Sequence, residues 1–406
     1  IADRHGTPTY VYSVAKLRAN ALKCLRMPNA HGLTIRYAMK ANPSATLLRF
    51  LEGMGLSFDA SSTWEARRAI KAGIPADRIS LSSQELPQDF EDLAREGVEI
   101  NCCSLDQLDR FGKAFPGKEA GIRLNPGVGS GLNNRLSTGG VAASFGIWHG
   151  HVGNILEVVK RHGLRITRIH THVGTGGDPD LWFDTATRSL RNLDQFPDVT
   201  TVDLGGGFKV ARVQGETESD LNVVGEALKS VIEGVYERTG RKLHLELEPG
   251  NFLAATIGGI LCRAQDITDT GEGGYTFLKL DTGMTEILRP SLYGAQHGLR
   301  LLSNESNATG KRPYAVVGHC CESGDVLTVA PGDPETLATR ELPHAEIGDL
   351  LFVEDAGAYC SAMPAKHYNS FPEAAEVIVR EDGSIKLIRR RQTLEQVIEN
   401  DRIIDL

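Results

Sequence analysis

This chain lacks an excess of basic residues, a long apolar run and an even number of cysteines. The 406 residues have a net charge of −8, which argues against nucleic-acid binding, because counterion release needs a basic surface. No apolar run approaches the roughly 20 residues that span a bilayer. The seven cysteines are odd in number and lack zinc-ligand spacing, so we expect reduced thiols and a cytoplasmic location. The chain begins at Ile1, which leaves open whether a leader was removed.

What the chain does contain is an alternation of short β-rich runs with amphipathic helical patterns. Its length exceeds one typical core, and its 41% hydrophobic and 24% charged residues are those of an ordinary globular protein. The expected strands are Thr34–Met39, Leu56–Ala60, Ile79–Ser83, Glu99–Cys102, Ala120–Asn125, Ile166–Val173, Thr200–Leu204 and Leu243–Glu248. Eight strands with intervening helices predict an α/β protein with a closed (β/α)8 barrel of the TIM type, and an open doubly wound sheet is the alternative.

The pattern changes near Gly258. Later runs such as Tyr275–Leu280 and Ala375–Arg380 are β-like and are separated by loops with little helical pattern, which predicts a second, mainly β domain. The opening Thr7–Tyr12 is also strand-like, and we expect it to join the second sheet. The sequence therefore divides into a barrel domain at 14–257 and a mainly β domain at 258–406 together with 1–13.

Chemically useful side chains stand where the barrel strands end. Active sites of such barrels form at the carboxyl ends of the strands, and these ends present Lys40, His172, the triglycine 205–207 and Glu248. Desolvation would favour the neutral amine of Lys40, the form that condenses with an aldehyde, so Lys40 is a candidate for holding a cofactor as a Schiff base. A solvated lysine at a strand end is the simpler interpretation of this residue taken alone.

The other strand ends also allow two interpretations. The glycines at 205–207 let backbone N–H groups approach an anion such as a phosphate, although a triglycine is often only a tight turn. His170 and His172 share one face of a strand; we expect one ring to stack on a planar cofactor rather than a metal site, because no third ligand is evident. Glu248 suits the ring nitrogen of a pyridine, or it is an ordinary salt-bridged glutamate.

Two loops of the second domain carry further candidates. Cys321 stands beside Glu322 in a glycine-containing loop. This arrangement suits a proton donor next to a carboxylate that reads the substrate, although adjacent cysteines are more often packing residues. Tyr359 stands at a strand-to-loop junction, where its hydroxyl either reaches a phosphate or lies in the core.

The motifs, taken in order, resemble those of the diaminopimelate decarboxylases, which are pyridoxal-phosphate enzymes with an alanine-racemase-like barrel. The likeness covers nearly the whole chain, from Gly6–Tyr12 to Leu387–Gln392. The motifs that carry it are YAMKAN (37–42), FDASS (58–62), RLNPG (123–127), SFG (144–146), HTHVGT (170–175), DLGGGF (203–208), LEPG (247–250), RPSLYG (289–294), CESGD (321–325) and DAGAY (355–359). Each is modest alone, and their common order makes a chance match implausible.

The resemblance implies a homodimer that binds pyridoxal 5′-phosphate and shares its active sites between subunits. Lys40 would form the Schiff base, His172 would stack on the ring, and Glu248 would face the ring nitrogen. Cys321 of the partner subunit would protonate the substrate after CO2 has left, beside Glu322 of the partner subunit. The residues implied to bind the cofactor are Lys40, His172, Thr175, Gly205, Gly206, Gly207, Glu248, Gly250 and Tyr359. Those implied to bind the substrate are Arg289, Tyr293, Glu322 and Asn251, and no metal is implied.

The implied reaction is decarboxylation of meso-2,6-diaminopimelate to L-lysine and CO2, the last step of lysine biosynthesis. Two departures from the family concern the far end of the substrate. Asn251 stands where the family has an arginine, and an amide cannot supply a bidentate charged contact. Arg289 alone would then have to anchor the distal carboxylate. Pro364 and Lys366 also depart from the family's pattern.

Three alternatives remain open at this point. A decarboxylase of the D-lysine or D-ornithine type is suggested by Asn251 and opposed by Arg289 and Tyr293. A racemase of the same fold is disfavoured by Glu248, because racemases of this group usually pair the ring nitrogen with an arginine. A non-catalytic homologue that binds pyridoxal phosphate is opposed by the presence of both Lys40 and Cys321.

Overall fold

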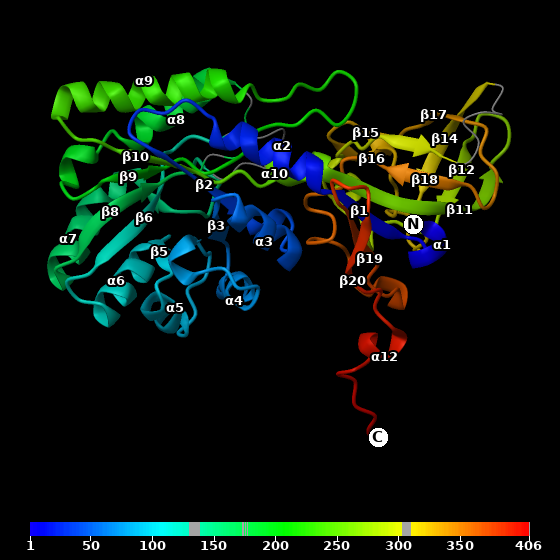
Figure 1. Ribbon diagram of the computed structural model, residues 1–406, viewed down its shortest axis with the longest axis horizontal. Coiled ribbons are helices and arrows are strands. Elements are labelled where there is room, and N and C mark those ends of the chain that lie inside the picture. Colours follow the sequence, from blue (N-terminus) through cyan, green and yellow to red (C-terminus); the bar gives the residue numbers. More distant parts are fainter. Residues whose placement is uncertain (130–138, 173, 175, 177, 303–309, 406) are drawn as a thin grey trace. The chain divides into compact units, whose positions relative to one another are not determined.

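The chain divides into two units (Figure 1). The structure, a computed structural model, describes residues 1–129, 139–172, 174, 176, 178–302 and 310–405. One unit comprises Arg18–Val210 and Thr217–Leu253, and the other comprises Ile1–Leu17, Ala211–Glu216 and Ala254–Leu406. Residues 211–216, which we expected in the barrel domain, belong to the second unit. Within the described residues, no helix combines the length and apolar character needed to cross a membrane.

The first unit is built on a closed parallel barrel. Its strands are β2 (Leu33–Ala38), β3 (Ser57–Ala60), β4 (Ile79–Leu81), β5 (Glu99–Cys102), β6 (Glu119–Asn125), β8 (Arg165–His170), β9 (Thr201–Asp203) and β10 (His244–Leu247). Each pairs in parallel with the next, β10 pairs with β2, and the short β7 (Ile147–Trp148) joins β6 outside this ring. The expected (β/α)8 barrel is therefore confirmed, and the open sheet is wrong.

Helices follow most of the barrel strands (Figure 1). They are α2 (Val14–Leu25), α3 (Ala45–Gly53), α4 (Thr63–Lys71), α5 (Phe90–Glu96), α6 (Leu105–Ala114), α7 (Val152–His162), α8 (Pro179–Ser189), α9 (Leu221–Thr239) and α10 (Asn251–Ala254). Polar caps fix where several begin: the side chain of Ser62 accepts the N–H of Glu65, and that of Ser104 accepts the N–H of Gln107. Gly163 and Gly240 adopt the left-handed conformation that ends α7 and α9.

Four charged side chains from four barrel strands form a network. Glu246 on β10 lies 2.8 Å from Arg36 on β2 and 3.0 Å from Arg168 on β8, and these three residues are buried. Glu99 on β5 lies 2.7 Å from the same Arg168 guanidinium. Because strands of this barrel are covered on both faces, the buried charges are tolerated only as mutual partners.

The second unit is mainly β, as expected. Its strands are β1 (Thr9–Ser13), β11 (Gly258–Asp269), β12 (Thr276–Leu280), β13 (Leu299–Leu301), β14 (Lys311–Val317), β15 (Val329–Ala330), β16 (Asp333–Leu337), β17 (Arg340–Pro343), β18 (Leu350–Val353), β19 (Ala375–Val379) and β20 (Ile385–Arg389). Short helices α1 (Ala2–His5), α11 (Arg289–Tyr293) and α12 (Leu394–Val397) complete it.

The first strand of the chain lies in the middle of the second unit's sheet. β1 pairs antiparallel with β11 and parallel with β19, so strands from both ends of the chain flank each other. Tyr10 and Tyr12 on β1 are buried, and their rings stack. The expectation that Thr7–Tyr12 joins the second sheet is thus confirmed.

Candidate active site

Lys40 stands just beyond the carboxyl end of β2. The strand ends at Ala38, one residue earlier than predicted, and a 3₁₀ turn (Met39–Ala41) carries the lysine. Its Nζ donates to Asp59 Oδ2 at 3.1 Å and to Ser61 Oγ at 3.2 Å. The Lys40 side chain is 41% exposed, so the desolvated lysine expected from the sequence is wrong. The turn lifts the amine out of the core and leaves it accessible to a ligand.

Glu248 follows β10 and is buried with two other ionisable side chains. The ligand atoms of His170, Asp203 and Glu248 all lie within 4.8 Å of one another. Sequence reasoning found no third ligand beside the histidine pair, because the three residues come from three different strands. Burial, and next the charge of Asp59, raises the pKa of Glu248 to about 7. Burial, and next Glu248, raises the pKa of Asp203 well above its usual value.

Two oxygens of this cluster lack a donor. Glu248 Oε1 and Asp203 Oδ2 are buried and have no hydrogen-bond partner among the described residues. The other Asp203 oxygen, Oδ1, accepts the backbone N–H of Gly205 at 2.9 Å. Two carboxyl groups in a dry site require a proton or another donor between or beside them. The cluster is therefore ready to accept a hydrogen bond from a protonated ligand atom.

A chain of hydrogen bonds holds His170 in place. Asn101 Nδ2 donates to Ser82 Oγ at 3.0 Å, and Ser82 Oγ lies 3.2 Å from His170 Nδ1. Burial lowers the pKa of His170 to about 4, so the ring is neutral. Its Nε2 lies 3.5 Å from Glu248 Oε2 without a hydrogen bond among the described residues. His170 is thus an uncharged neighbour of Glu248 and leaves the Glu248 oxygens for a ligand.

The triglycine brings the backbone against His172 and Glu248. A Cβ on Gly205 would lie 2.4 Å from His172 Nδ1, and one on Gly206 would lie 2.1 Å from the carbonyl oxygen of Glu248. The Gly206 N–H donates to His172 Nδ1 at 3.2 Å. Burial, and next the charge of Arg123, lowers the pKa of His172 well below its usual value, so this ring is also neutral. A flat, uncharged imidazole held in one orientation suits stacking on an aromatic ring.

The triglycine's expected role in holding a phosphate stays a prediction. The N–H groups of Gly205 and Gly206 already donate to Asp203 and His172, so these glycines act in the structure by permitting close approach. Thr175, the other phosphate candidate in the barrel, lies outside the described residues. Gly250 packs on the end of β2, where an added Cβ would lie 3.1 Å from the Ala38 oxygen. Asn251, next in the chain, begins α10.

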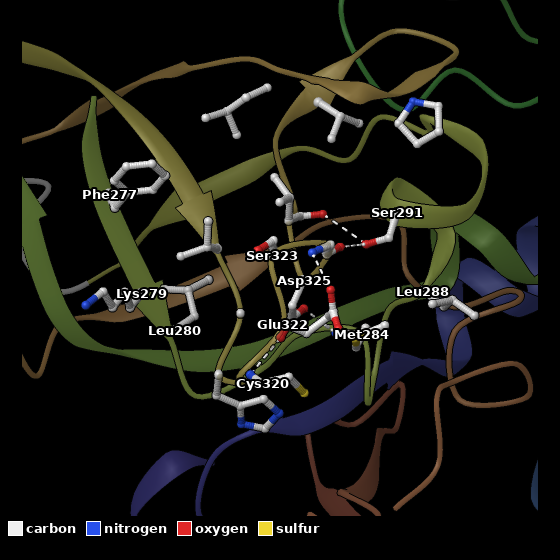
Figure 2. Close-up of a pocket in the computed structure, with 18 of the residues that line it drawn as sticks. Phe277, Lys279, Leu280, Met284, Leu288, Ser291, Cys320, Glu322, Ser323 and Asp325 are labelled. Atoms are coloured by element: carbon white, nitrogen blue, oxygen red, sulfur yellow. Dashed lines mark hydrogen bonds between the residues drawn. The ribbon is translucent and has the colours of Figure 1, made fainter. Parts of the chain in front are cut away.

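In the second unit, the loop after β14 carries Cys321 and Glu322. Asp325 fixes this loop by accepting the N–H groups of Cys320 at 2.8 Å and Met284 at 2.6 Å (Figure 2). The Cys321 N–H donates to Asn369, and Cys321 is exposed. Tyr368 donates its hydroxyl to Glu322 Oε2 at 3.1 Å. The loop is thus held as a rigid unit that presents a thiol and a carboxylate.

The same loop borders a cavity. Figure 2 shows Glu322, Ser323 and Asp325 on one side of it, with Ser291 of α11 facing them; the cavity measures about 1330 Å³. The Ser291 hydroxyl donates to the Gly324 carbonyl oxygen at 2.6 Å. All residues that line the cavity belong to the second unit.

The other expected substrate residues lie around α11. Arg289 Nη1 donates to His297 Nε2 at 2.8 Å. The Tyr293 hydroxyl donates to the Met363 sulfur at 4.0 Å, which is a weak acceptor. Tyr359 adopts a positive φ of 56°, an uncommon conformation for a bulky residue that is frequent near functional sites.

Comparison with known proteins identifies the family of this chain. Residues 15–255 match the family described as pyridoxal-dependent decarboxylase, pyridoxal binding domain. The chain belongs to the pyridoxal-dependent decarboxylases. Diaminopimelate decarboxylases from Streptomyces coelicolor and Escherichia coli are 33% and 31% identical to it, over 98% and 97% of this chain and 90% and 93% of theirs.

Solved structures agree with this assignment. A crystal structure of a diaminopimelate decarboxylase has a TM-score of 0.91 at 30% identity and covers 98% of this chain and 94% of its own. The diaminopimelate decarboxylase from Helicobacter pylori complexed with L-lysine has a TM-score of 0.85 at 26% identity, with 98% and 97% covered. The resemblance drawn from the motifs, the pyridoxal-phosphate cofactor and the assignment to amino-acid decarboxylases are confirmed.

The barrel residues fit pyridoxal phosphate. Its pyridinium N–H is a donor of the kind that the partnerless Glu248 Oε1 lacks. The glycines let the backbone pass close to His172 and to the Glu248 carbonyl, where a side chain would clash. The accessible amine of Lys40 suits attachment to the cofactor's aldehyde carbon. Each of these features belongs to the barrel unit alone.

Sequence reasoning missed or undervalued some residues of both units. Asp59 was noted only within the FDASS motif, yet it is the ion-pair partner of Lys40. His170 was treated as an alternative to His172, although it lies beside Glu248 instead. Arg212 and His297 drew no attention, because their partners lie up to 143 residues away and no local motif marks them.

Proposed function

We propose that this protein decarboxylates meso-2,6-diaminopimelate to L-lysine and CO2, the last step of lysine biosynthesis. The observation that carries the proposal is the pairing, in one barrel, of an accessible lysine with a buried glutamate oxygen that lacks a donor. The choice of substrate follows the relatives, which are diaminopimelate decarboxylases. When bound, pyridoxal phosphate supplies an electron sink for the bond that breaks at the substrate's α-carbon.

The barrel residues hold that cofactor. Lys40 would hold it through Nζ and would give way to the substrate amine. Glu248 keeps a proton on the ring nitrogen, and His172 stacks on the ring face. The residues proposed to complete the cofactor site are Thr175, Gly205, Gly206, Gly207, Gly250 and Tyr359. Fixed charges and dipoles that meet developing charge are usually the largest contribution to such a rate.

The substrate site includes residues of the second domain. Arg289 and Tyr293 hold the distal carboxylate, with Asn251 and Glu322 as further contacts. Cys321 delivers the proton to the α-carbon after CO2 has left. On the resemblance, Cys321 of the partner subunit does this, which makes the active unit a homodimer.

The barrel domain, 14–257, binds the cofactor, and 258–406 with 1–13 completes the site. A cytoplasmic location fits the seven free cysteines.

A decarboxylase of D-lysine or D-ornithine is the second candidate, because Asn251 is neutral. The test is CO2 release from meso-diaminopimelate, D-lysine, D-ornithine and L-lysine, with pyridoxal phosphate supplied. Release confined to meso-diaminopimelate supports the proposal. Faster CO2 release from D-lysine or D-ornithine would mean that one of these is the substrate, while the assignment as a decarboxylase would stand. Protein that binds the cofactor but releases no CO2 would be the non-catalytic homologue.

A further inference from the structure

A second arginine stands beside Arg289 in the second unit. Residues 211–216 leave the barrel unit and cluster with the second one, and they carry Arg212. Its Nε donates to the Asp355 carbonyl oxygen at 3.4 Å, in the segment that follows β18. Arg289 donates to His297, which contacts the Glu354 carbonyl oxygen, one residue before Asp355. Two arginines from segments far apart in the sequence are thus tied to adjacent residues of that segment.

The partner of Arg289 orients it without neutralising it. His297 is buried, and its Nδ1 lies 2.9 Å from the Glu354 carbonyl oxygen. Since a carbonyl oxygen can only accept, Nδ1 carries the proton and Nε2 accepts from Arg289. Burial, and next the charge of Arg289, lowers the pKa of His297 well below its usual value. No carboxylate among the described residues forms an ion pair with Arg289, so its positive charge is retained.

Acidic residues also lie near Arg212. Burial and then Arg289 lower the pKa of Arg212 to about 9, although Glu216 and Asp355 act in the opposite direction. Burial raises the pKa of the neighbouring Cys360 thiol to about 11, so it is neutral. Two half-buried guanidiniums of like charge repel each other, and a bound anion relieves that repulsion. Each guanidinium also offers a planar fork of donors that matches a carboxylate.

We propose that Arg212 and Arg289 together bind the distal carboxylate of the substrate, and that Arg212 selects dicarboxylic over monocarboxylic diamino acids. This rests on the proposed function. Meso-diaminopimelate carries a second carboxylate that D-lysine lacks, and a pair of guanidiniums distinguishes the two compounds by charge. Arg212 supplies the second cation that the neutral Asn251 does not.

The test compares Arg212→Met, Arg212→Lys and an exposed control, Arg380→Met, with cofactor bound. We measure kcat and KM for meso-diaminopimelate and for D-lysine. Loss of one charge-assisted contact should raise KM for meso-diaminopimelate about 10-fold to 100-fold and leave the D-lysine values unchanged. Arg212→Lys, which keeps the charge without the fork, should fall between wild type and Arg212→Met. Arg380→Met should match wild type.

Other results overturn the inference and are distinguishable. If Arg212→Met changed kcat/KM equally for both substrates, or for neither, Arg212 would not select between them. The proposed decarboxylation of meso-diaminopimelate would still stand. A cofactor phosphate is the other anion that two arginines could hold. Weaker binding of pyridoxal phosphate by Arg212→Met, with an unchanged KM for meso-diaminopimelate, would assign the pair to that phosphate instead. Wild-type protein that prefers D-lysine would overturn both the inference and the proposed substrate.

Discussion

The barrel side chains proposed to hold the cofactor differ in their exposure to solvent. Lys40 is accessible, whereas Glu248 is buried. Glu248 follows β10, the last barrel strand, which pairs with β2, the strand before Lys40. Asp59 links the two, because it pairs with Lys40 and also raises the pKa of Glu248. The reactive amine and the electron-sink partner are therefore electrostatically coupled before any ligand arrives.

Replacing Lys40 tests the covalent role directly. Lys40→Ala should remove the visible absorbance of the attached cofactor and lower CO2 release by at least about 1,000-fold, because the amine that exchanges with the substrate is absent. The measurement is an absorbance spectrum with pyridoxal phosphate, followed by a CO2 assay. Lys160→Ala, on the exposed face of α7, is the control and should behave as wild type. Full activity in Lys40→Ala would refute the assignment.

Cys321 is predicted to act on the substrate and not on the cofactor. Cys321→Ala should slow turnover about 100-fold to 10,000-fold, the range expected for a lost proton donor, while the absorbance of bound cofactor stays unchanged. Cys320→Ala is a matched control, since burial and the charge of Asp325 raise the pKa of Cys320 to about 12 and keep it a thiol. If Cys321→Ala instead released the cofactor, the residue would have a structural role.

At the scale of elements, the barrel depends on the charge network among its strands. Glu246→Gln would leave Arg36 and Arg168 buried without their shared carboxylate, so unfolding in urea should show a loss of about 3–5 kcal/mol. Glu226→Gln, at an exposed ion pair on α9, should change stability by less than about 1 kcal/mol. Equal effects of the two substitutions would contradict the importance of burial.

The same network sets a pH dependence. Burial raises the pKa of Glu246, but Arg36 and Arg168 outweigh it, so the folded pKa lies below its usual value. The carboxylate's contribution is then fully present above the unfolded pKa of roughly 4.3. It is lost as pH falls through the lower folded pKa. Wild-type stability should therefore fall more steeply below about pH 4 than that of Glu246→Gln.

Elements were more predictable from the sequence than contacts. The barrel strands could be located because short apolar runs and Gly or Pro junctions are local signals, and β5 was placed at Glu99–Cys102 as observed. The strand before Lys40 was predicted to end one residue too late, since apolar character continues through Met39 into the 3₁₀ turn. The His170–Asp203–Glu248 cluster and the Arg212–Arg289 pair were beyond local reasoning, because each depends on strands or loops brought together only by folding.

At the scale of the whole molecule, the two units carry different parts of one proposed reaction. The barrel holds every residue proposed to face the ring of the cofactor, and the second unit holds the thiol and the arginines proposed to face the substrate. Such a division is useful in a symmetric dimer, where a surface of one subunit can complete the site of the other. It also makes the dimer testable by mixing defective subunits.

Subunit mixing tests whether two chains share each active site. Lys40→Ala and Cys321→Ala chains with different affinity tags are co-expressed, and species that carry both tags are purified. If Cys321 serves the partner subunit's Lys40, one of the two sites in this heterodimer is intact, and about half of wild-type activity should appear. Each homodimeric variant, carried through the same purification with two tags, is the control and should stay near its own low activity. A heterodimer no more active than these controls would mean that Lys40 and Cys321 act within one chain, because both sites would then be defective.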